Sequence, residues 1–469
     1  MVEEPRVHDS VPRDGVDIPE VERRQRWATR SRAVDWAVYL LLTLASIGLV
    51  LVHVPQHTTV SPIDEYVYID YLAKVPTNGI VREGEETGSY ARQYLSCHGV
   101  RTIGYYPEEM CSNPQASQEA RLPNGGYTSA DLYTPLYFGA TWVMAQPLEF
   151  LGVDDLTTAG RYTGWTWLAG AGIFLYVALR RLKVPAPVGA GVALLMVGSL
   201  PAYWSNTYIS TDASALFAGA LMFFAATGLI NPTRRRIILF IIFAVVVALL
   251  KLQNLMAVGA AALFVLIYTA SVAARSLGRW QGRLGRFLRD RRTLTAIAAL
   301  VAAVLAQGIW VVTRSILAVG EFPDQGVSAP FGKMAFLREM LSFFPGVSIG
   351  ALDPKSFGIW AVLAYSLLAW VIVAGVLGLL ASSRRGSVSE ALGIASFVVA
   401  LVAAPALAIA NIAVSGYYFV LPARYGMSLI PFFLACAALL FGRKAWIGYL
   451  IPVLGVISYA AVLAIPEVQ

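Results

Sequence analysis

The segment that follows the first long apolar run carries two adjacent carboxylates. It reads Ser61-Pro62-Ile63-Asp64-Glu65-Tyr66-Val67-Tyr68. A carboxylate that is partly desolvated near a membrane surface is well suited to act as a general base. Asp64 and Glu65 are therefore the first candidates for proton transfer. The alternative is an acidic loop that is simply solvated.

Four further residues lie where apolar runs begin or end. Asp212 follows the third run, Lys251 separates the fifth from the sixth, and Arg424 and Tyr425 begin the tenth. A guanidinium can donate two parallel hydrogen bonds to the oxygens of one phosphate, and an ammonium adds a second positive charge. The alternatives are a helix N-cap for Asp212 and contact with lipid headgroups for the two cations. Together the acids and cations suit sugar transfer from a polyprenyl phosphate: a carboxylate deprotonates the acceptor hydroxyl, and Arg424 and Lys251 hold the departing phosphate.

The composition indicates whether the protein is water-soluble or lies in a membrane. Of 469 residues, 57% are hydrophobic and 14% are charged, whereas soluble domains have about 25% charged residues. A water-soluble globule is therefore excluded. The net charge of +7 comes largely from basic clusters between apolar runs, a pattern typical of membrane topology and not of nucleic-acid binding. Three Cys and four His exclude a zinc ribbon or an iron–sulfur protein.

The apolar runs predict an all-α polytopic membrane protein. A helix crosses the hydrocarbon core with about 20 residues. Eleven runs are of roughly that length, and they cover 33–54, 161–180, 187–205, 213–230, 236–250, 254–274, 293–315, 357–381, 388–412, 425–441 and 445–464.

The arginine clusters predict the orientation of the chain. They lie in the N-terminal segment, at 180–183, at 234–236, between 275 and 292, at 384–385 and at 443–444. Since positive charge favours the cytoplasmic side, we expect a cytoplasmic N-terminus and an external C-terminus in a multi-pass protein of the cell membrane. This requires that the apolar stretch 134–150 does not cross fully, so we interpret it as a juxtamembrane or re-entrant helix.

The same topology defines the domains. Residues 1–32 are charged and contain three prolines, which predicts a disordered cytoplasmic tail. Residues 33–469 form a single transmembrane domain with two long external loops, 55–160 and 316–356. Long ordered loops often carry function, so we expect the site there. Cys97 and Cys111 lie in the first loop, on the oxidising side, and we expect a disulfide between them; two free thiols are the alternative.

Several short motifs resemble one family. They are Pro62-Ile63-Asp64-Glu65, Tyr133-Thr134-Pro135-Leu136-Tyr137, Arg161, Thr211-Asp212-Ala213 and Ala423-Arg424-Tyr425. The set resembles the GT-C superfamily of integral membrane glycosyltransferases, and most closely a bacterial group with Pro-Asp-Glu-Pro-x-His in the first loop. The chain departs from that group by the inserted Ile63 and by Tyr66-Val67-Tyr68 in place of Pro-x-His.

The resemblance implies a GT-C-like fold, and a role for each matching residue. Asp64 takes the place of the catalytic base, Glu65 is its acidic neighbour and Asp212 is the second acid. Arg424 corresponds to a ligand of the lipid phosphate. Tyr66 and Tyr137 would contact substrate. The donor would be a polyprenyl-phosphate-linked sugar, and the acceptor a glycan or protein of the cell envelope.

The implied reaction is an inverting single displacement, which needs no protein nucleophile and no obligatory cofactor. Mg²⁺ or Mn²⁺ bridging Asp64 and Asp212 is the alternative to charge balance by Arg and Lys, and the sequence does not decide between them. A transporter or flippase of lipid-linked saccharides is the rival function, and a non-catalytic envelope-assembly subunit is the third. Transporters place ionisable residues near the bilayer midplane, whereas the predicted spans are nearly free of charge at their centres. The lack of charge at the centres of the spans favours a reaction at the membrane surface over transport through the bilayer.

Overall fold

The computed structural model describes residues 20–100, 111, 122–275, 280–321, 328–351 and 353–466. The chain divides into two compact units, Met1–Leu41 and Leu42–Gln469, and the second unit contains all of the candidate site residues. Over the described residues the secondary structure is helical, apart from two isolated bridges, Glu86 with Tyr127 and Ala329 with Tyr418. The prediction of an all-α polypeptide is thereby confirmed.

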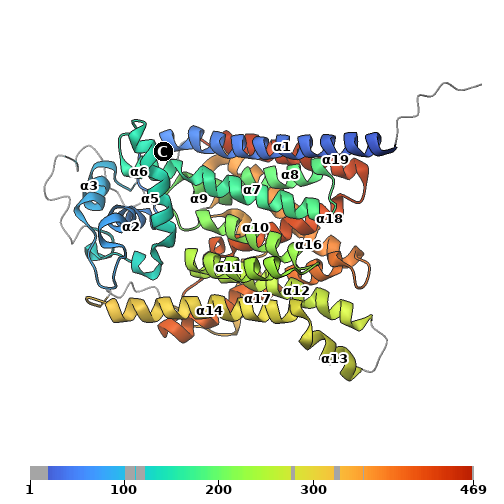
Figure 1. The fold of residues 1–469 in the computed structure, drawn as a ribbon. Coiled ribbons are helices and arrows are strands. Elements are labelled where there is room, and N and C mark those ends of the chain that lie inside the picture. Colours follow the sequence, from blue (N-terminus) through green and yellow to red (C-terminus); the bar gives the residue numbers. More distant parts are fainter. Residues whose placement is uncertain are drawn as a thin grey trace, which may run out of the picture. The chain divides into compact units, whose positions relative to one another are not determined.

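Figure 1 shows how the helices are arranged. Their bounds are α1 Glu20–His53, α2 Glu65–Asn78, α3 Ser89–His98, α5 Pro135–Phe150, α6 Leu156–Tyr162, α7 Gly164–Arg181, α8 Ala186–Val197, α9 Leu200–Thr207, α10 Ala213–Gly228, α11 Arg234–Leu250, α12 Leu255–Ala274, α13 Trp280–Arg289, α14 Arg291–Leu317, α15 Lys333–Ser342, α16 Gly358–Ser382, α17 Val388–Ser415, α18 Ile430–Phe441 and α19 Ala445–Leu463.

Helix α1 begins inside the segment predicted as a disordered tail. Residues 20–32 are helical, and their Glu, Arg and Gln residues are good helix formers despite their charge. The disordered tail over residues 1–32 stays a prediction. The first 19 residues lie outside the described part of the chain.

Seven helical segments of the described chain are long and apolar enough to cross a membrane, and an eighth is counted if the bent pair α8 and α9, at 56°, is one span. This supports a multi-pass membrane protein. The remaining predicted spans correspond to α7, α10 and α11, which have 18, 16 and 17 residues. The number eleven therefore stays a prediction.

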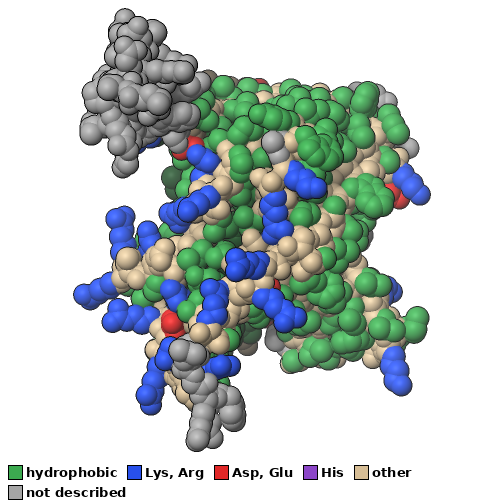
Figure 2. All heavy atoms as spheres, turned by 90° about the vertical axis from the view of Figure 1, so that its right-hand side faces the viewer, with side chains coloured by type: hydrophobic (Ala, Val, Ile, Leu, Met, Phe, Trp, Pro, Cys, Tyr) green, Lys and Arg blue, Asp and Glu red, His purple; other side chains and the backbone are tan. Residues whose placement is uncertain are grey.

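The basic clusters of the second unit gather at one end of its helices, which we call the basic face. Helices α7, α12, α16 and α18 end there, and α11, α14, α17 and α19 begin there. Arg292 donates to the Ile230 carbonyl (2.7 Å) and Arg443 to the Ser382 carbonyl (3.1 Å). Figure 2 shows many Lys and Arg side chains and few acidic ones on this face. Which face is cytoplasmic stays a prediction.

The first long loop lies at the opposite end of the second unit. Helices α2, α3, α5 and α6 gather there in Figure 1, and α5 packs on α2 and α6. Thr134 caps α5 by accepting a hydrogen bond from the Leu136 amide (3.3 Å), and Pro135 suits the first helical turn. Helix α5 has 16 residues, fewer than a span requires. That 134–150 does not cross the membrane stays a prediction.

The C-terminal part of α14 contacts this loop. The Trp310 indole donates to the Leu132 carbonyl (3.2 Å). Arg314 forms ion pairs with Asp131 and with Glu83, the second at 3.2 Å. Because these contacts come from one long helix, the residues around Tyr133 are fixed to a span.

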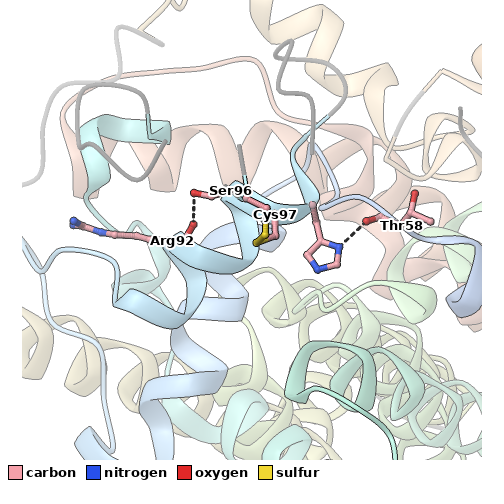
Figure 3. The surroundings of a disulfide bond; sticks show 6 residues. Thr58, Arg92, Ser96 and Cys97 are labelled. Atoms are coloured by element: carbon pink, nitrogen blue, oxygen red, sulfur yellow. Dashed lines mark hydrogen bonds between the residues drawn. A yellow bond between two sulfur atoms is a disulfide. The ribbon is translucent and has the colours of Figure 1, made fainter. Parts of the chain in front are cut away.

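The predicted disulfide is present in the structure. Cys97 at the end of α3 is bonded to Cys111 (Figure 3). Next to it, the ring of His98 is hydrogen-bonded to the Thr58 carbonyl (3.0 Å). Helix α3 is therefore attached to the segment that leads into Asp64.

Candidate functional site

A fully buried ion pair organises the segment before α2. Both carboxylate oxygens of Glu65 accept hydrogen bonds from Arg161, each at 2.8 Å. They also accept hydrogen bonds from the backbone amides of Ser61 (2.7 Å) and Ile209 (3.0 Å). Two further Arg161 N–H groups donate to the carbonyls of His57 and Thr59. Both carboxylate oxygens and all three guanidinium nitrogens thus have hydrogen-bond partners within the protein, as burial of charge requires.

This arrangement gives Glu65 a structural position, and the catalytic role predicted for it stays a prediction. Its side chain has no exposed surface, and it fixes backbone on both sides of the site instead of facing a substrate. Arg161 lies on the short helix α6 and was recognised from the sequence only as part of a motif. A lone arginine at the start of a predicted apolar run was the signal for this buried pair.

Asp64 is placed quite differently from its neighbour. It is the N-terminal cap residue of α2 and adopts the left-handed conformation, with φ 58°. This conformation is uncommon outside glycine but tolerated by Asp and Asn. Its side chain is 44% exposed and accepts a hydrogen bond from Arg424 at 2.7 Å. Asp64 is therefore the solvent-accessible acid of the pair.

Arg424 joins the two acids that the sequence predicted to share a site. It lies in a 3₁₀ turn, Ala423–Leu429, before α18. One guanidinium nitrogen bonds Asp64, and Nε lies 3.6 Å from the Asp212 carboxylate. This Nε is buried without a hydrogen bond. Arg424 thus contacts both carboxylates at once.

Lys251 completes the cluster from the connection between α11 and α12. Its ammonium forms an ion pair with Asp212, and its side chain is buried. Burial lowers the pKa of Lys251, and the charge of Asp212 opposes that shift. Lys251, Asp212, Arg424 and Asp64 thus form a continuous chain of alternating charges, which we call the charge cluster.

Aromatic rings surround the charge cluster. The Lys251 ammonium lies 5.5 Å from the centre of the Tyr425 ring and 6.0 Å from that of Tyr133. Tyr68 donates to the Tyr133 hydroxyl (3.1 Å). Burial raises the pKa of both phenols well above the usual value, so they stay neutral and can donate hydrogen bonds. Tyr425 was predicted as a site residue; Tyr68 and Tyr133 carried no assigned role.

Two other predicted contacts lie away from the charge cluster. Tyr66 is buried against Thr87, with the two hydroxyls 2.7 Å apart. Tyr137 is buried against Trp167, and its hydroxyl accepts the Ser210 amide (3.2 Å). These positions do not support direct substrate contact by Tyr66 and Tyr137, which stays a prediction. On a helix, residue 68 returns to the side of residue 64, whereas residue 66 faces away.

The segment that carries Arg424 is fixed by a buried glutamate of α15. Glu339 accepts hydrogen bonds from the Tyr418 hydroxyl and from the Leu421 amide, the latter at 3.3 Å. Both donors lie shortly before Arg424 in the chain. The second external loop thus positions the guanidinium, as expected from its length, but through a residue that the sequence did not single out.

An apolar groove of about 970 Å³ lies between the first long loop and α14. Its walls come from α5, α14, the end of α2 and Leu249, and include Val143, Met144 and Ile309. Thr134 in the wall donates to the Leu249 carbonyl (2.5 Å). Thr134 follows Tyr133 in the sequence, and Leu249 lies two residues before Lys251, so the groove and the charge cluster are built from neighbouring segments of the chain.

The predicted alternative of a bridging metal fits these residues poorly. Asp64 and Asp212 share Arg424 between them, and Lys251 occupies the other side of Asp212. The described residues include no group of three or more His, Cys, Asp or Glu side chains arranged to hold a metal. Because each carboxylate is already paired with a cation, neither is free to ligate a divalent ion.

Searches against protein-family models and against curated proteins found no match to this chain.

Proposed function

We propose that the protein is a GT-C-like membrane glycosyltransferase that uses a polyprenyl-phosphate-linked sugar. The observation that carries the proposal is the charge cluster, in which an exposed carboxylate, Asp64, is joined to two largely buried cations. A separate apolar groove is lined by residues that neighbour Tyr133 and Lys251 in the sequence. A base, a phosphate site and a channel for a lipid tail are the three parts that such a reaction needs.

In the proposed reaction the donor phosphate binds to Arg424 and Lys251, and its prenyl chain lies in the apolar groove. The Asp64 carboxylate takes the proton of the acceptor hydroxyl as that oxygen attacks the anomeric carbon. The bond between the anomeric carbon and the phosphate oxygen breaks, and its electrons leave with the polyprenyl phosphate. Buried cations stabilise this developing charge more strongly than exposed ones would. The sugar is inverted, and the acceptor is a glycan or a protein of the cell envelope.

The test is to place the purified protein in vesicles with synthetic polyprenyl-phosphate-linked sugars and an envelope extract as acceptor. We expect free polyprenyl phosphate and glycosylated acceptor to form together. Movement of the intact lipid-linked sugar between leaflets without its consumption would indicate the rival transporter. Neither consumption nor movement, with any sugar of the set, would favour the non-catalytic subunit.

Arg424→Ala should raise the donor concentration needed for half-saturation by roughly 10- to 100-fold, because a hydrogen bond to a charged group contributes about 1.5–3 kcal/mol. Arg424→Lys keeps the charge but loses the fork, so we expect a smaller increase. The measurement is initial rate against donor concentration.

The control for this prediction is Lys355→Ala, which removes an exposed cation from the second external loop. It should leave donor saturation unchanged. If Arg424→Ala also leaves it unchanged, Arg424 only pairs the two acids and does not bind the donor phosphate.

A further inference from the structure

Helix α13 is confined to the basic face by its neighbours. It connects α12 to α14, and both of these belong to the segments that are long and apolar enough to cross a membrane. A short helix between the ends of two spans lies at the level where the bilayer meets water. Its side chains therefore face lipid headgroups or solvent unless other parts of the protein cover them.

The residues of α13 divide into two sides. Leu284, Phe287 and Leu288 are spaced as i, i+3 and i+4, which places them on one side. Arg283, Arg286 and Arg289 are three residues apart and lie on the opposite side. Leu284 is 44% and Leu288 50% exposed. The apolar side is thus largely uncovered by the protein.

The three arginines of α13 also lack partners within the described part of the chain. All are exposed, and none forms a hydrogen bond or ion pair with another described residue. Arg292, at the start of α14, provides the contrast, since it donates to the Leu229 and Ile230 carbonyls and pairs with Asp290. Some arginines of the basic face thus hold the protein together, whereas those of α13 do not.

We propose that α13 lies in the headgroup layer of the bilayer and binds anionic phospholipids. Leu284 and Leu288 enter the boundary of the acyl chains, and the three arginines bind headgroup phosphates. An uncovered apolar side opposite a row of arginines is the pattern of helices that lie in the membrane surface. This interaction is independent of the proposed transferase activity, because it lies at the opposite end of the helices from the charge cluster.

The experiment uses the full chain with a nitroxide spin label at Leu284→Cys. Cys436 is buried and Cys97 is disulfide-bonded, so the unsubstituted protein serves as the labelling blank. The protein is placed in nanodiscs of phosphatidylcholine alone or with about one third phosphatidylglycerol, an anionic lipid. Accessibility of the label to oxygen, which enters the bilayer, is compared with its accessibility to a water-soluble nickel chelate.

We expect the ratio of oxygen to nickel accessibility to rise when phosphatidylglycerol is present. Arg283→Gln/Arg286→Gln/Arg289→Gln should abolish this rise. The matched control is Arg234→Gln/Arg235→Gln, which removes exposed charge elsewhere on the basic face and should preserve it. Salt at about 1 M shortens the screening length to about 3 Å. In the protein with its arginines intact, this salt should therefore lower the accessibility ratio to its value without phosphatidylglycerol. An unchanged ratio in the two nanodiscs, or a rise that survives both salt and the triple substitution, would overturn the proposal.

Discussion

Asp64→Asn is expected to reduce sugar transfer by roughly 10²- to 10⁴-fold, the range that a positioned general base contributes. The amide keeps the size of the carboxylate but cannot take the acceptor proton. Asn also tolerates the left-handed backbone that position 64 requires, so the local fold should persist. Arg424 keeps Asp212 as a partner, and donor saturation should change less than the maximal rate.

The measurement is the maximal transfer rate of the purified variant, together with incorporation of sugar into the envelope of cells that lack their own copy. Glu86→Gln is the matched control, since Glu86 is an exposed acid of the same loop that pairs with Arg92. Exposed pairs contribute about 1 kcal/mol or less, so this variant should transfer sugar normally. Normal transfer by Asp64→Asn, at a normal protein level, would remove Asp64 from the role of base.

Arg161→Met is expected to lower the free energy of unfolding by about 3–5 kcal/mol, because it leaves the Glu65 carboxylate buried without its counter-charge. It also leaves the carbonyls of His57 and Thr59 without their donors. The loop that leads into Asp64 should then lose its fixed geometry. The measurement is equilibrium unfolding of the protein in detergent micelles.

The double substitution Arg161→Met/Glu65→Leu separates stability from positioning. Removing both charges should recover the part of the lost stability that comes from the unpaired buried carboxylate. Transfer should stay low because the backbone amides of Ser61 and Ile209 lose their common acceptor. Arg82→Ala is the control, since its side chain is 47% exposed and pairs with Glu85 at the surface. It should change stability by about 1 kcal/mol or less. A comparable effect of Arg82→Ala and Arg161→Met would contradict the structural role of the buried pair.

Hydropathy and charge in the sequence were sufficient to predict the helical membrane architecture, since both follow directly from the physics of the bilayer. Apolar runs predict where helices lie, and arginine clusters predict which helix ends share a side. The meeting of Asp64, Asp212, Lys251 and Arg424 followed from the same reasoning, because each lies at the same end of a predicted span. The predicted topology alone placed these four residues at the same depth in the membrane.

Side-chain direction was not available from the sequence. Asp64 and Glu65 are adjacent and chemically similar, yet Asp64 precedes α2 in a left-handed conformation and is exposed, whereas Glu65 begins the helix and is buried. Their partners are distant in the chain, Arg424 for one and Arg161 for the other. Glu339 was missed for the same reason, because its partners Tyr418 and Leu421 are far along the chain.

The sharing of Arg424 between two carboxylates has a kinetic consequence. The charge cluster holds two anions and two cations, so its formal charges balance before any substrate arrives. A donor phosphate that takes the Arg424 guanidinium must compete with Asp64, and the displaced carboxylate then becomes available to an acceptor hydroxyl. In the proposed transferase the donor would therefore bind first and the acceptor second, and an acceptor analogue should be an uncompetitive inhibitor with respect to the donor.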